Sequence, residues 1–386
     1  MPNFDARSTL FMAGLYIHIP FCKQACYYCN FHFSTSLRHR DDMVAAIVEE
    51  LDLRKAYLNG ATLDSIYIGG GTPSLLNDQE LGQIFEQINR LYPIADHAEI
   101  TLEANPDDLS KERLQLFAQS SINRLSIGIQ SFSEADLRFM NRAHSALEAQ
   151  HCIQLARDCG FESMSVDLIY GSPSTSAQQW ADNLQQVIDL QIPHLSCYCL
   201  TVEPGTALDH FVRKGKEKPV DEEKAADQFE YMQQTLNAAG YLHYEISNFA
   251  QPGQMAVHNS NYWKGVPYLG IGPSAHSFNG QSRQWNIAHN AKYLKAIQQK
   301  EVPCEVEILS SSTRYNEYIM TALRTMWGVD LRELQNLHPT FTDFFVAKSQ
   351  AYINRGQLIR KGDQFSLKES ARLLADGIAM ELFWEE

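Results

Sequence analysis

Short runs of β-branched and other apolar residues alternate with longer amphipathic segments over the first two-thirds of the chain. Six of these runs have the length of buried strands and lie at residues 15–19, 65–70, 98–104, 124–130, 164–171 and 194–200. The segments between them have helical periodicity, for example 41–58 and 145–161, where Gly160 is placed to end a helix. The alternation predicts an α/β fold in which parallel strands, joined by right-handed crossovers, form a partial (β/α)6 barrel of the TIM-like kind.

The pattern changes from about residue 305 onward. The segment "TRYNEYIMTALRTMWGVDLREL" predicts two helices broken at Gly328, and "FTDFFVAKSQAYINRG" predicts a third that ends at Gly356. A hairpin with its turn at Gly362 and Asp363 and one last helix follow. Helices combined with a small hairpin resemble a winged-helix module, and we expect it to pack on the barrel or cover it.

Charge and composition narrow the class of protein. The chain has 386 residues and a net charge of −14, and residues 300–386 carry ten basic and thirteen acidic side chains, which argues against a nucleic-acid partner. No run of about 18 apolar residues occurs, so the sequence predicts no membrane span and leaves peripheral membrane contact open. Residues 1–14 lack the pattern of a signal peptide, and eight cysteines in a chain this long do not indicate a disulfide framework. We therefore expect a cytoplasmic protein.

Polar residues and glycines follow the predicted strands at or near their carboxyl ends. A cysteine cluster follows the first strand, "GGGTPS" follows the second, and Glu103, Gln130 and Asp167 lie at or near the ends of the next three. The glycine-rich segment is neither a Walker A loop nor a G-x-G-x-x-G fingerprint, but it lets the backbone approach a ligand closely. Because carboxyl ends of parallel strands meet at one edge of a sheet, these residues predict one shared pocket.

Cys22, Cys26 and Cys29 have the spacing C-x3-C-x2-C. Thiolates bind soft metals, and iron–sulfur clusters are normally held by four of them, so three would leave one iron open. The alternative is a zinc knuckle in which His32 supplies the fourth ligand, in the pattern C-x3-C-x2-C-x2-H. The residue types alone leave both sites open.

The position of this triad, directly after the first strand of a β/α array, resembles the radical S-adenosylmethionine (SAM) superfamily. The resemblance implies that the three cysteines hold a [4Fe–4S] cluster. It also implies that the amino and carboxylate groups of SAM complete the open iron, and that reduction cleaves SAM to methionine and a 5′-deoxyadenosyl radical. Tyr28 and Phe31 would shield the cluster from solvent.

Further motifs narrow the resemblance. "YIHIPFC", "GGGTPS", "LEANP", "IGIQSF", "MNRAH" and "DLIYGSP" are similar to the subfamily that contains oxygen-independent coproporphyrinogen III oxidase (dehydrogenase) and the haem chaperone HemW. The SAM contacts implied by this resemblance are Tyr16, Gly70, Gly71, Thr72, Glu103, Gln130, Arg142 and Asp167, beside Tyr28. Arg142 could fork onto a carboxylate, Glu103 could accept from an ammonium or hydroxyl group, and Asp167 could accept from ribose hydroxyls.

Two features distinguish the members of this subfamily. The dehydrogenase has a fourth cysteine two residues after the triad, where this chain has Phe31. It also has a longer segment before the first strand, whereas only about fourteen residues precede that strand here. Both departures favour the chaperone.

The segment "VHNSNYWKG" resembles an H-N-x-x-Y-W motif associated with haem binding in HemW proteins. His258 could ligate haem iron, Tyr262 and Trp263 could pack on the macrocycle, and Asn259 and Asn261 could form hydrogen bonds. Chemistry alone favours an ordinary loop at the edge of a core, and the resemblance reverses that preference. His276, in "GIGPSAHSF", is a rival iron ligand that we leave out of the predicted site.

The resemblance therefore implies a haem chaperone that uses a [4Fe–4S] cluster, SAM and haem. Its partners would be a haem-acceptor protein and a reductant such as a flavodoxin or ferredoxin. The alternatives are a coproporphyrinogen III oxidase in porphyrin biosynthesis and, more distantly, a zinc-bearing interaction protein. The expected division is a radical SAM core at 1–240, the haem motif and a connection at 241–304, and a C-terminal helical domain of this subfamily at 305–386.

Overall fold

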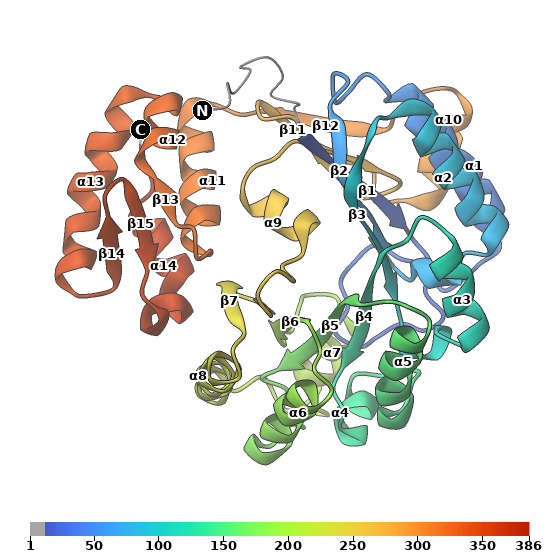
Figure 1. The fold of residues 1–386 in the computed structure, drawn as a ribbon, viewed down its shortest axis with the longest axis horizontal. Coiled ribbons are helices and arrows are strands. Elements are labelled where there is room, and N and C mark those ends of the chain that lie inside the picture. Colours follow the sequence, from blue (N-terminus) through green and yellow to red (C-terminus); the bar gives the residue numbers. More distant parts are fainter. Residues whose placement is uncertain (1–11, 386) are drawn as a thin grey trace, which may run out of the picture.

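The computed structural model describes residues 12–385, so residues 1–11, which make up most of the segment 1–14 from which the absence of a signal peptide was inferred, lie outside the described part. Its centre is a curved parallel sheet (Figure 1). The six parallel strands that follow the predicted runs are β1 (Met12–Ile19), β2 (Thr62–Gly70), β3 (Ile94–Ala104), β4 (Arg124–Gln130), β5 (Ser163–Tyr170) and β6 (His194–Cys199). They lie side by side in chain order, which confirms the predicted α/β class.

The helices on the outer face of this sheet are α1 (Arg40–Leu53), α2 (Asp78–Leu91), α3 (Lys111–Gln119), α4 (Glu134–Phe139), α5 (Ala146–Asp158), α6 (Ala177–Asp189) and α8 (Glu222–Ala238). The short helix α7 (Ala207–Arg213) instead packs on the cysteine loop, where the Leu208 amide donates to the Tyr27 carbonyl at 2.8 Å. α5 ends before Gly160, whose φ of +97° lies in the left-handed region that glycine tolerates. α1 is shorter than the predicted 41–58, because Arg54 leaves the helix and donates to the buried carbonyl of Gly270. No helix among residues 12–385 is long and apolar enough to cross a membrane.

Local sequence explains where several helices begin. Asn77 accepts a hydrogen bond from the Glu80 amide, and the Glu80 carboxylate accepts one from the Asn77 amide, which forms a capping box at the start of α2. The same reciprocal pairs start α5, at Ser145 and Glu148, and α6, at Ser176 and Gln179. Each pair satisfies two backbone groups that would otherwise lack partners at a helix end.

The sheet continues beyond the six predicted strands on both sides. The additional elements are β7 (Leu242–Glu245), β8 (Asn248–Ala250), α9 (Val257–Trp263), β9 (Tyr268–Ile271), β10 (His276–Phe278), β11 (Ser282–Asn286), α10 (Asn290–Gln298) and β12 (Cys304–Ile308). The described strand order is β12-β11-β10-β9-β1-β2-β3-β4-β5-β6-β8-β7. β9 pairs in parallel with β1, whereas β10, β11 and β12 pair in antiparallel fashion, so the barrel stays open and its inner face is extended.

A buried carboxylate fastens this extension to α1. The Oε2 atom of Glu50 accepts hydrogen bonds from the Gly272 amide at 2.8 Å and the Tyr293 hydroxyl at 2.7 Å. Its Oε1 atom accepts from Asn286 at 2.7 Å and from the buried Arg54 at 3.3 Å. The Glu50 side chain is fully buried, so this one residue joins α1, α10 and the ends of β9 and β11.

The C-terminal module consists of α11 (Ser311–Leu323), β13 (Val329–Asp330), α12 (Leu331–Leu337), α13 (Pro339–Asn354), β14 (Leu358–Lys361), β15 (Gln364–Leu367), a 3-10 helix (Glu369–Leu374) and α14 (Ala375–Glu381). The predicted break at Gly328 and the turn at Gly362 and Asp363 are present, while β13 was not predicted. Gly328 is required because a Cβ atom there would lie 2.0 Å from the carbonyl oxygen of Phe365. The module has a hydrophobic core of its own, centred on Tyr315 and Phe345.

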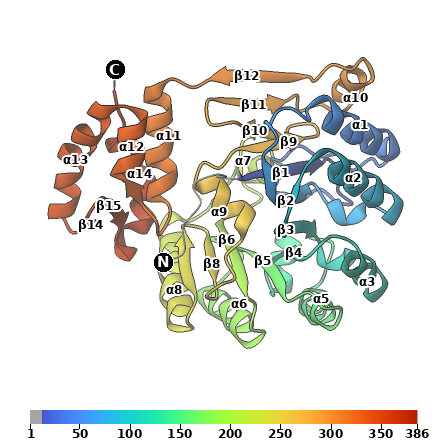
Figure 2. The same ribbon diagram turned by 45° about the horizontal axis from the view of Figure 1, so that its top comes forward.

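The module docks against β7 and α9 at one side of the open barrel (Figure 2). The Ile246 amide donates to the Arg324 carbonyl at 3.0 Å, and the Met326 amide donates to the Tyr244 carbonyl at 2.8 Å. The Lys264 ammonium group lies 4.3 Å from the ring centroid of Trp327. β12 spans the expected boundary at residue 305 and belongs to the large sheet.

We expect Glu50→Ala to lower the free energy of unfolding by about 3–5 kcal/mol, because it leaves the buried Arg54 cation without a carboxylate partner and the Gly272 amide without its acceptor. Urea denaturation followed by circular dichroism measures this loss. The matched control is Glu49→Ala, which removes a half-exposed ion pair with Lys300 and is expected to cost less than about 1 kcal/mol. Equal losses for the two variants would contradict the role given to Glu50.

Candidate functional site

The three cysteines lie in a loop that closes on itself directly after β1. The Ser34 amide donates to the Pro20 carbonyl at 2.9 Å, and the Cys22 amide donates to the Ser34 carbonyl at 3.0 Å. Cys22, Cys26 and Cys29 are each partly buried, and burial raises the pKa of the Cys22 thiol to about 11. A bound metal would reverse that shift, because a coordinated thiol is deprotonated.

Arg142 connects the cysteine loop to the loops after β3 and β4. Its Nη1 atom donates to the Cys26 Sγ at 3.1 Å, and Nη2 donates to Asn105 Oδ1 and to the Gly128 carbonyl, both at 2.6 Å. Asn105 in turn donates to the Thr72 hydroxyl at 3.1 Å. Four of the strand ends are therefore tied together around one partly buried cation. Among residues 12–385, Arg142 forms no ion pair with a carboxylate, and its buried Nε atom has no hydrogen-bond partner.

The glycines after β2 allow the backbone to pass close to its neighbours. A Cβ atom on Gly71 would lie 2.5 Å from the Phe21 carbonyl oxygen, and one on Gly70 would lie 2.6 Å from the His18 ring. The Gly71 amide donates to the Ile19 carbonyl at 2.8 Å. Side chains at these two positions would push the glycine segment away from His18 and Phe21. Glycine is therefore needed at both positions for the two segments to lie this close together.

Two histidines connect the cysteine loop to its surroundings: His18 contacts it from β1, and His32, within the loop, contacts Asn290. The Nε2 atom of His18 donates to the His32 carbonyl at 2.9 Å, so its Nδ1 atom accepts from the Tyr16 hydroxyl at 3.0 Å. The Nε2 atom of His32 lies 2.6 Å from Asn290 Oδ1, so this ring nitrogen already takes part in a hydrogen bond. In the described part of the chain, no three His, Cys, Asp or Glu side chains converge as ligands of a single ion.

Two carboxyl groups face the barrel interior next to the cysteine loop. Glu103 accepts hydrogen bonds from the Tyr67 hydroxyl at 2.7 Å and from the Gly70 amide at 2.9 Å. Burial raises the pKa of Glu103 to about 7 and that of Asp167 to about 6. The negative charge of Asp167 adds to the effect on Glu103, while the hydrogen bond from Tyr67 opposes it. Such groups can accept a proton or a hydrogen bond near neutral pH.

Gln130 ends β4 with a φ of +70°, in the left-handed region that non-glycine residues seldom adopt. Its side-chain amide lies over Gly128, where a Cβ atom would approach it to 2.9 Å. Backbone strain of this kind persists where the surroundings impose it, and it clusters at ligand sites. Gln130 and Arg142 therefore both lie next to Gly128, whose carbonyl accepts a hydrogen bond from Arg142.

The helix α9 carries the H-N-x-x-Y-W motif and lies against the inner face of the barrel (Figure 2). The amides of Val257 and His258 each donate to the buried Glu99 carboxylate at 2.9 Å. A hydrogen bond of 3.0 Å joins His258 Nδ1 to the Ser65 hydroxyl. The His258 ring stacks on Tyr67 with centroids 5.1 Å apart, and burial lowers its pKa to about 4. One ring nitrogen of His258 is therefore already used, and one ring face is covered.

Of the other motif residues, Asn259 and Asn261 contact the barrel, Trp263 contacts the C-terminal module, and Tyr262 is exposed to solvent. Asn259 donates to the Tyr244 hydroxyl at 3.3 Å, and Asn261 donates to both oxygens of Asp64 at 2.9–3.0 Å. Tyr262 is 52% exposed, and the Trp263 indole faces the Arg324 guanidinium at 5.5 Å. The motif thus attaches α9 to the barrel and to the C-terminal module, and only Tyr262 is well exposed.

The structure brings together most of the predicted SAM contacts and places the α9 motif deeper in the barrel. Tyr67 lies between the two groups, because its hydroxyl meets Glu103 and its ring meets His258. Sequence reasoning missed Tyr67, Asn105 and Tyr198, which also face this interior. Strand alternation could have identified Tyr67 and Tyr198, since each lies two residues from another inward-facing position.

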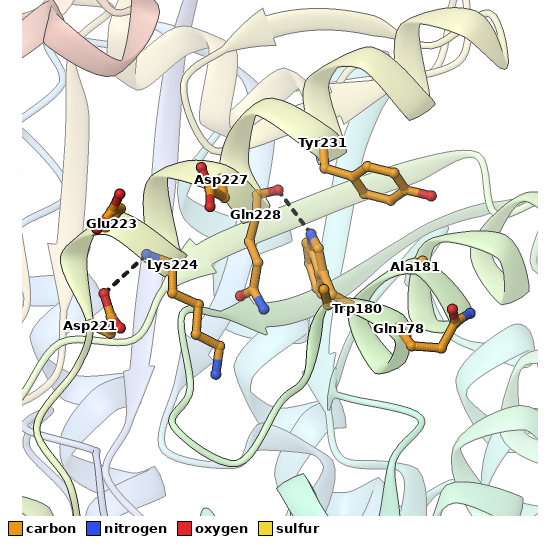
Figure 3. Close-up of a pocket in the computed structure, with 10 residues that line it drawn as sticks. Gln178, Trp180, Ala181, Asp221, Glu223, Lys224, Asp227, Gln228 and Tyr231 are labelled. Atoms are coloured by element: carbon orange, nitrogen blue, oxygen red, sulfur yellow. Dashed lines mark hydrogen bonds between the residues drawn. The ribbon is translucent and has the colours of Figure 1, made fainter.

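A separate groove of about 570 Å³ lies between α6 and α8 on the outside of the barrel (Figure 3). Trp180 Nε1 donates to the Gln228 carbonyl at 2.9 Å, and Lys224 Nζ donates to the Ser172 carbonyl at 2.9 Å. These contacts hold α8 against α6 and the loop after β5. Tyr231, 46% exposed, extends along the rim of the groove.

Comparisons with known proteins agree with this geometry. The family model of the radical SAM superfamily matches residues 16–187. The structure of coproporphyrinogen III oxidase (HemN) from Escherichia coli superposes with a TM-score of 0.85, covering 98% of this chain and 91% of that chain at 22% identity. That identity shows the fold alone, and fold and cysteine loop together define a radical SAM protein.

Sequence relatives specify the family within this class. The haem chaperone HemW of Mycobacterium tuberculosis (strain H37Rv) is 32% identical over 374 residues, which cover 96% of this chain and 94% of the relative. HemW of Escherichia coli K12 is 42% identical over 268 residues, covering 68% of this chain and 69% of the relative. The mitochondrial radical S-adenosyl methionine domain-containing protein 1 of mouse is 32% identical over 377 residues, which cover 90% of this chain and 81% of the relative. The chain belongs to the HemW family.

We expect the contribution of Glu103 to the stability of the chain to fall as the pH rises from about 4.5 to about 7. Native Glu103 keeps its proton up to about pH 7, whereas an unfolded glutamate loses it near its ordinary value of 4.5, so the native state binds more protons in this window. Glu103→Gln has no such proton to lose. Relative to wild type it should gain stability with rising pH, by up to on the order of 3 kcal/mol.

Urea denaturation of both proteins at several pH values, without added SAM, measures this difference. Glu162→Gln, a change at an exposed position, is the control and should keep the wild-type pH profile. Parallel profiles for wild type and Glu103→Gln would show that the raised pKa is not a property of Glu103.

Proposed function

We propose that this protein is a haem chaperone that binds haem and passes it to an acceptor protein, with a [4Fe–4S] cluster and SAM bound in the barrel. The observation that carries the proposal is the similarity to HemW over 96% of the chain, together with the cysteine loop at the carboxyl end of β1. Such a protein would act in the cytoplasm with a reductant such as a flavodoxin or ferredoxin. The unpaired state of all eight cysteines supports a reducing compartment.

The residues of the cysteine loop fit a cluster with one open iron. Cys22, Cys26 and Cys29 are partly buried and unpaired, and the loop is fixed at its base and by Arg142. Phe31, 71% exposed, stands where the oxidase would have a further cysteine, so it offers no fourth thiolate. When bound, the cluster would supply the electron that SAM chemistry requires.

The proposed SAM site is the adjoining pocket. Gly70 and Gly71 would hold the methionine end by close backbone approach, with Thr72 and Tyr16 beside them. The buried and unpartnered Nε of Arg142 fits an additional acceptor, and Glu103 and Asp167 are positioned to accept from ammonium or hydroxyl groups. Gln130 and Tyr28 would complete its walls.

Haem binding is proposed from the family, and the α9 motif remains its predicted site. Trp263 supports this role, because its indole Nε1 is buried and lacks an acceptor among the described residues. For His258 to ligate iron, however, its ring must separate from Tyr67. On this proposal the core at 1–240 and the segment at 241–304 hold the ligands, and the module at 305–386 closes the side of the barrel.

We expect Cys26→Ser to abolish the visible absorption of the reconstituted cluster, because the cluster loses one of three protein ligands. The fold should persist, since Cys26 is only partly buried. Iron and sulfide analysis after anaerobic reconstitution measures the loss. Cys199→Ser, at an exposed cysteine outside the loop, is the control and should keep the full iron content. A Cys26→Ser protein with wild-type iron and sulfide would contradict the ligand assignment.

Haem transfer tests the function itself. We expect the wild-type chain, loaded with one haem, to transfer it to an apo-haemoprotein faster than free haem does in the presence of a competing scavenger. An anaerobic assay with coproporphyrinogen III, SAM and a reductant should give no protoporphyrinogen. Turnover in that assay without haem transfer would replace the proposed function with that of the oxidase.

A further inference from the structure

The two edges of the large sheet differ in what covers them. At the β7 edge, the Met326 amide donates to the Tyr244 carbonyl at 2.8 Å, and the Ile246 amide donates to the Arg324 carbonyl at 3.0 Å. The C-terminal module therefore uses the backbone groups at that edge. β12 forms the opposite edge and, among the described strands, pairs only with β11 (Figure 2).

The hydrogen bonds at the two ends of the β11–β12 pair fix which residues of β12 face β11. The Ile287 amide donates to the Pro303 carbonyl at 2.9 Å, and the Leu309 amide donates to the Gln281 carbonyl at 3.0 Å. Because hydrogen-bonded pairs alternate along an antiparallel ladder, every second residue from 303 to 309 bonds to β11. The backbone groups of residues 304, 306 and 308 point away from β11.

Two of these outer positions carry exposed apolar side chains. Val306 is 54% exposed and Ile308 is 78% exposed, and residues two apart in a strand share one face. No hydrogen bond joins the amide or carbonyl groups of Val306 and Ile308 to another residue of the described chain. Free backbone groups beside apolar side chains are the template on which an extended peptide adds a strand to a sheet.

The other face of β12 is acidic. Glu305 is exposed, and Glu307 and Glu317 each lie 2.7 Å from the guanidinium of Arg283. Three carboxylates therefore share one cation, and these four side chains together carry a net negative charge.

This charge decides which kind of strand β12 can accept. If two copies of β12 paired in antiparallel fashion about Val306, Glu305 of each copy would lie opposite Glu307 of the other. Like charges directly opposite each other destabilise a strand pair, whereas opposite charges and apolar pairs stabilise it. A strand with Lys or Arg opposite the two carboxylates and apolar residues opposite Val306 and Ile308 would pair favourably on both faces.

We propose that β12 is a docking edge for a partner protein, which adds an extended segment of alternating apolar and basic residues to the large sheet as an antiparallel strand. The outward backbone groups of Val306 and Ile308 supply the hydrogen bonds, and Glu305 and Glu307 contact the cations of the segment. This inference goes beyond the proposed function and does not depend on haem, the cluster or SAM.

The probe for the test is a fluorescently labelled synthetic peptide in which Val alternates with Lys, titrated into the full-length protein and followed by fluorescence anisotropy. We expect saturable binding, and hydrogen exchange of the segment 304–308 should slow in the complex because its outward amides become hydrogen-bonded. A peptide in which Glu replaces every Lys should not bind. A wild-type chain that binds neither peptide would overturn the inference.

Val306→Pro removes one outward amide and leaves the ladder with β11 intact, and proline is tolerated where an edge-strand amide faces solvent. We expect this variant to weaken binding of the Lys peptide by about fivefold or more, the factor that corresponds to one lost hydrogen bond. Val306→Thr keeps both the amide and the β-branched shape, so it is the matched control and should bind like the wild type.

Glu305→Lys tests the charge at an exposed position, where the fold should not depend on it. It should weaken binding of the Lys peptide and allow the Glu peptide to bind. Glu162→Lys, which changes the net charge equally at an exposed position outside β12, is the control and should keep the wild-type preference.

Wild-type binding of the Lys peptide in both Val306→Pro and Glu305→Lys would overturn the inference, since the peptide would then bind elsewhere. A wild-type dimer that Val306→Pro dissociates would assign the edge to a second copy of the chain and overturn it equally. Neither result would change the proposed function, which haem transfer measures separately.

Discussion

The guanidinium of Arg142 keeps the loops after four strands in a fixed relation. It donates to Cys26 in the first loop and to Asn105 in the third, and Asn105 reaches Thr72 in the second. It also donates to the Gly128 carbonyl near the end of β4. A partly buried cation that lost one of these acceptors would carry a desolvation cost, which opposes independent shifts of the loops. The thiols are therefore held at a set position relative to the glycine segment and to Gln130.

A polar barrel interior requires that each inward-facing group find a partner, and this requirement explains much of the remaining architecture. The Glu99 carboxylate lies within 3.7 Å of Arg124 and accepts two amides from the start of α9. Arg124 in turn donates to the hydroxyls of Ser163 and Ser165 at 2.7 Å. Without α9 the Glu99 carboxylate would lose the two amide hydrogen bonds that it accepts from Val257 and His258. The helix thus has a structural role that is independent of any ligand.

Local periodicity was sufficient to predict the six central strands and most helices, because each is long enough to show a repeat and many start at a recognisable cap. It was insufficient for β9, β10 and β11, which have three to five residues and owe their place to pairing with β1 and to the buried Glu50. Strand ends also predicted which polar residues would gather near the cysteines. The burial of His258 could not be read from the sequence, since it depends on Tyr67, a residue nearly 200 positions away in the chain.

The position of Tyr67 bears on whether the protein could hold haem and SAM at the same time. A haem bound through His258 would have to displace the Tyr67 ring, and Tyr67 donates to Glu103 in the proposed SAM pocket. Binding of one ligand would then disturb the other through a single side chain.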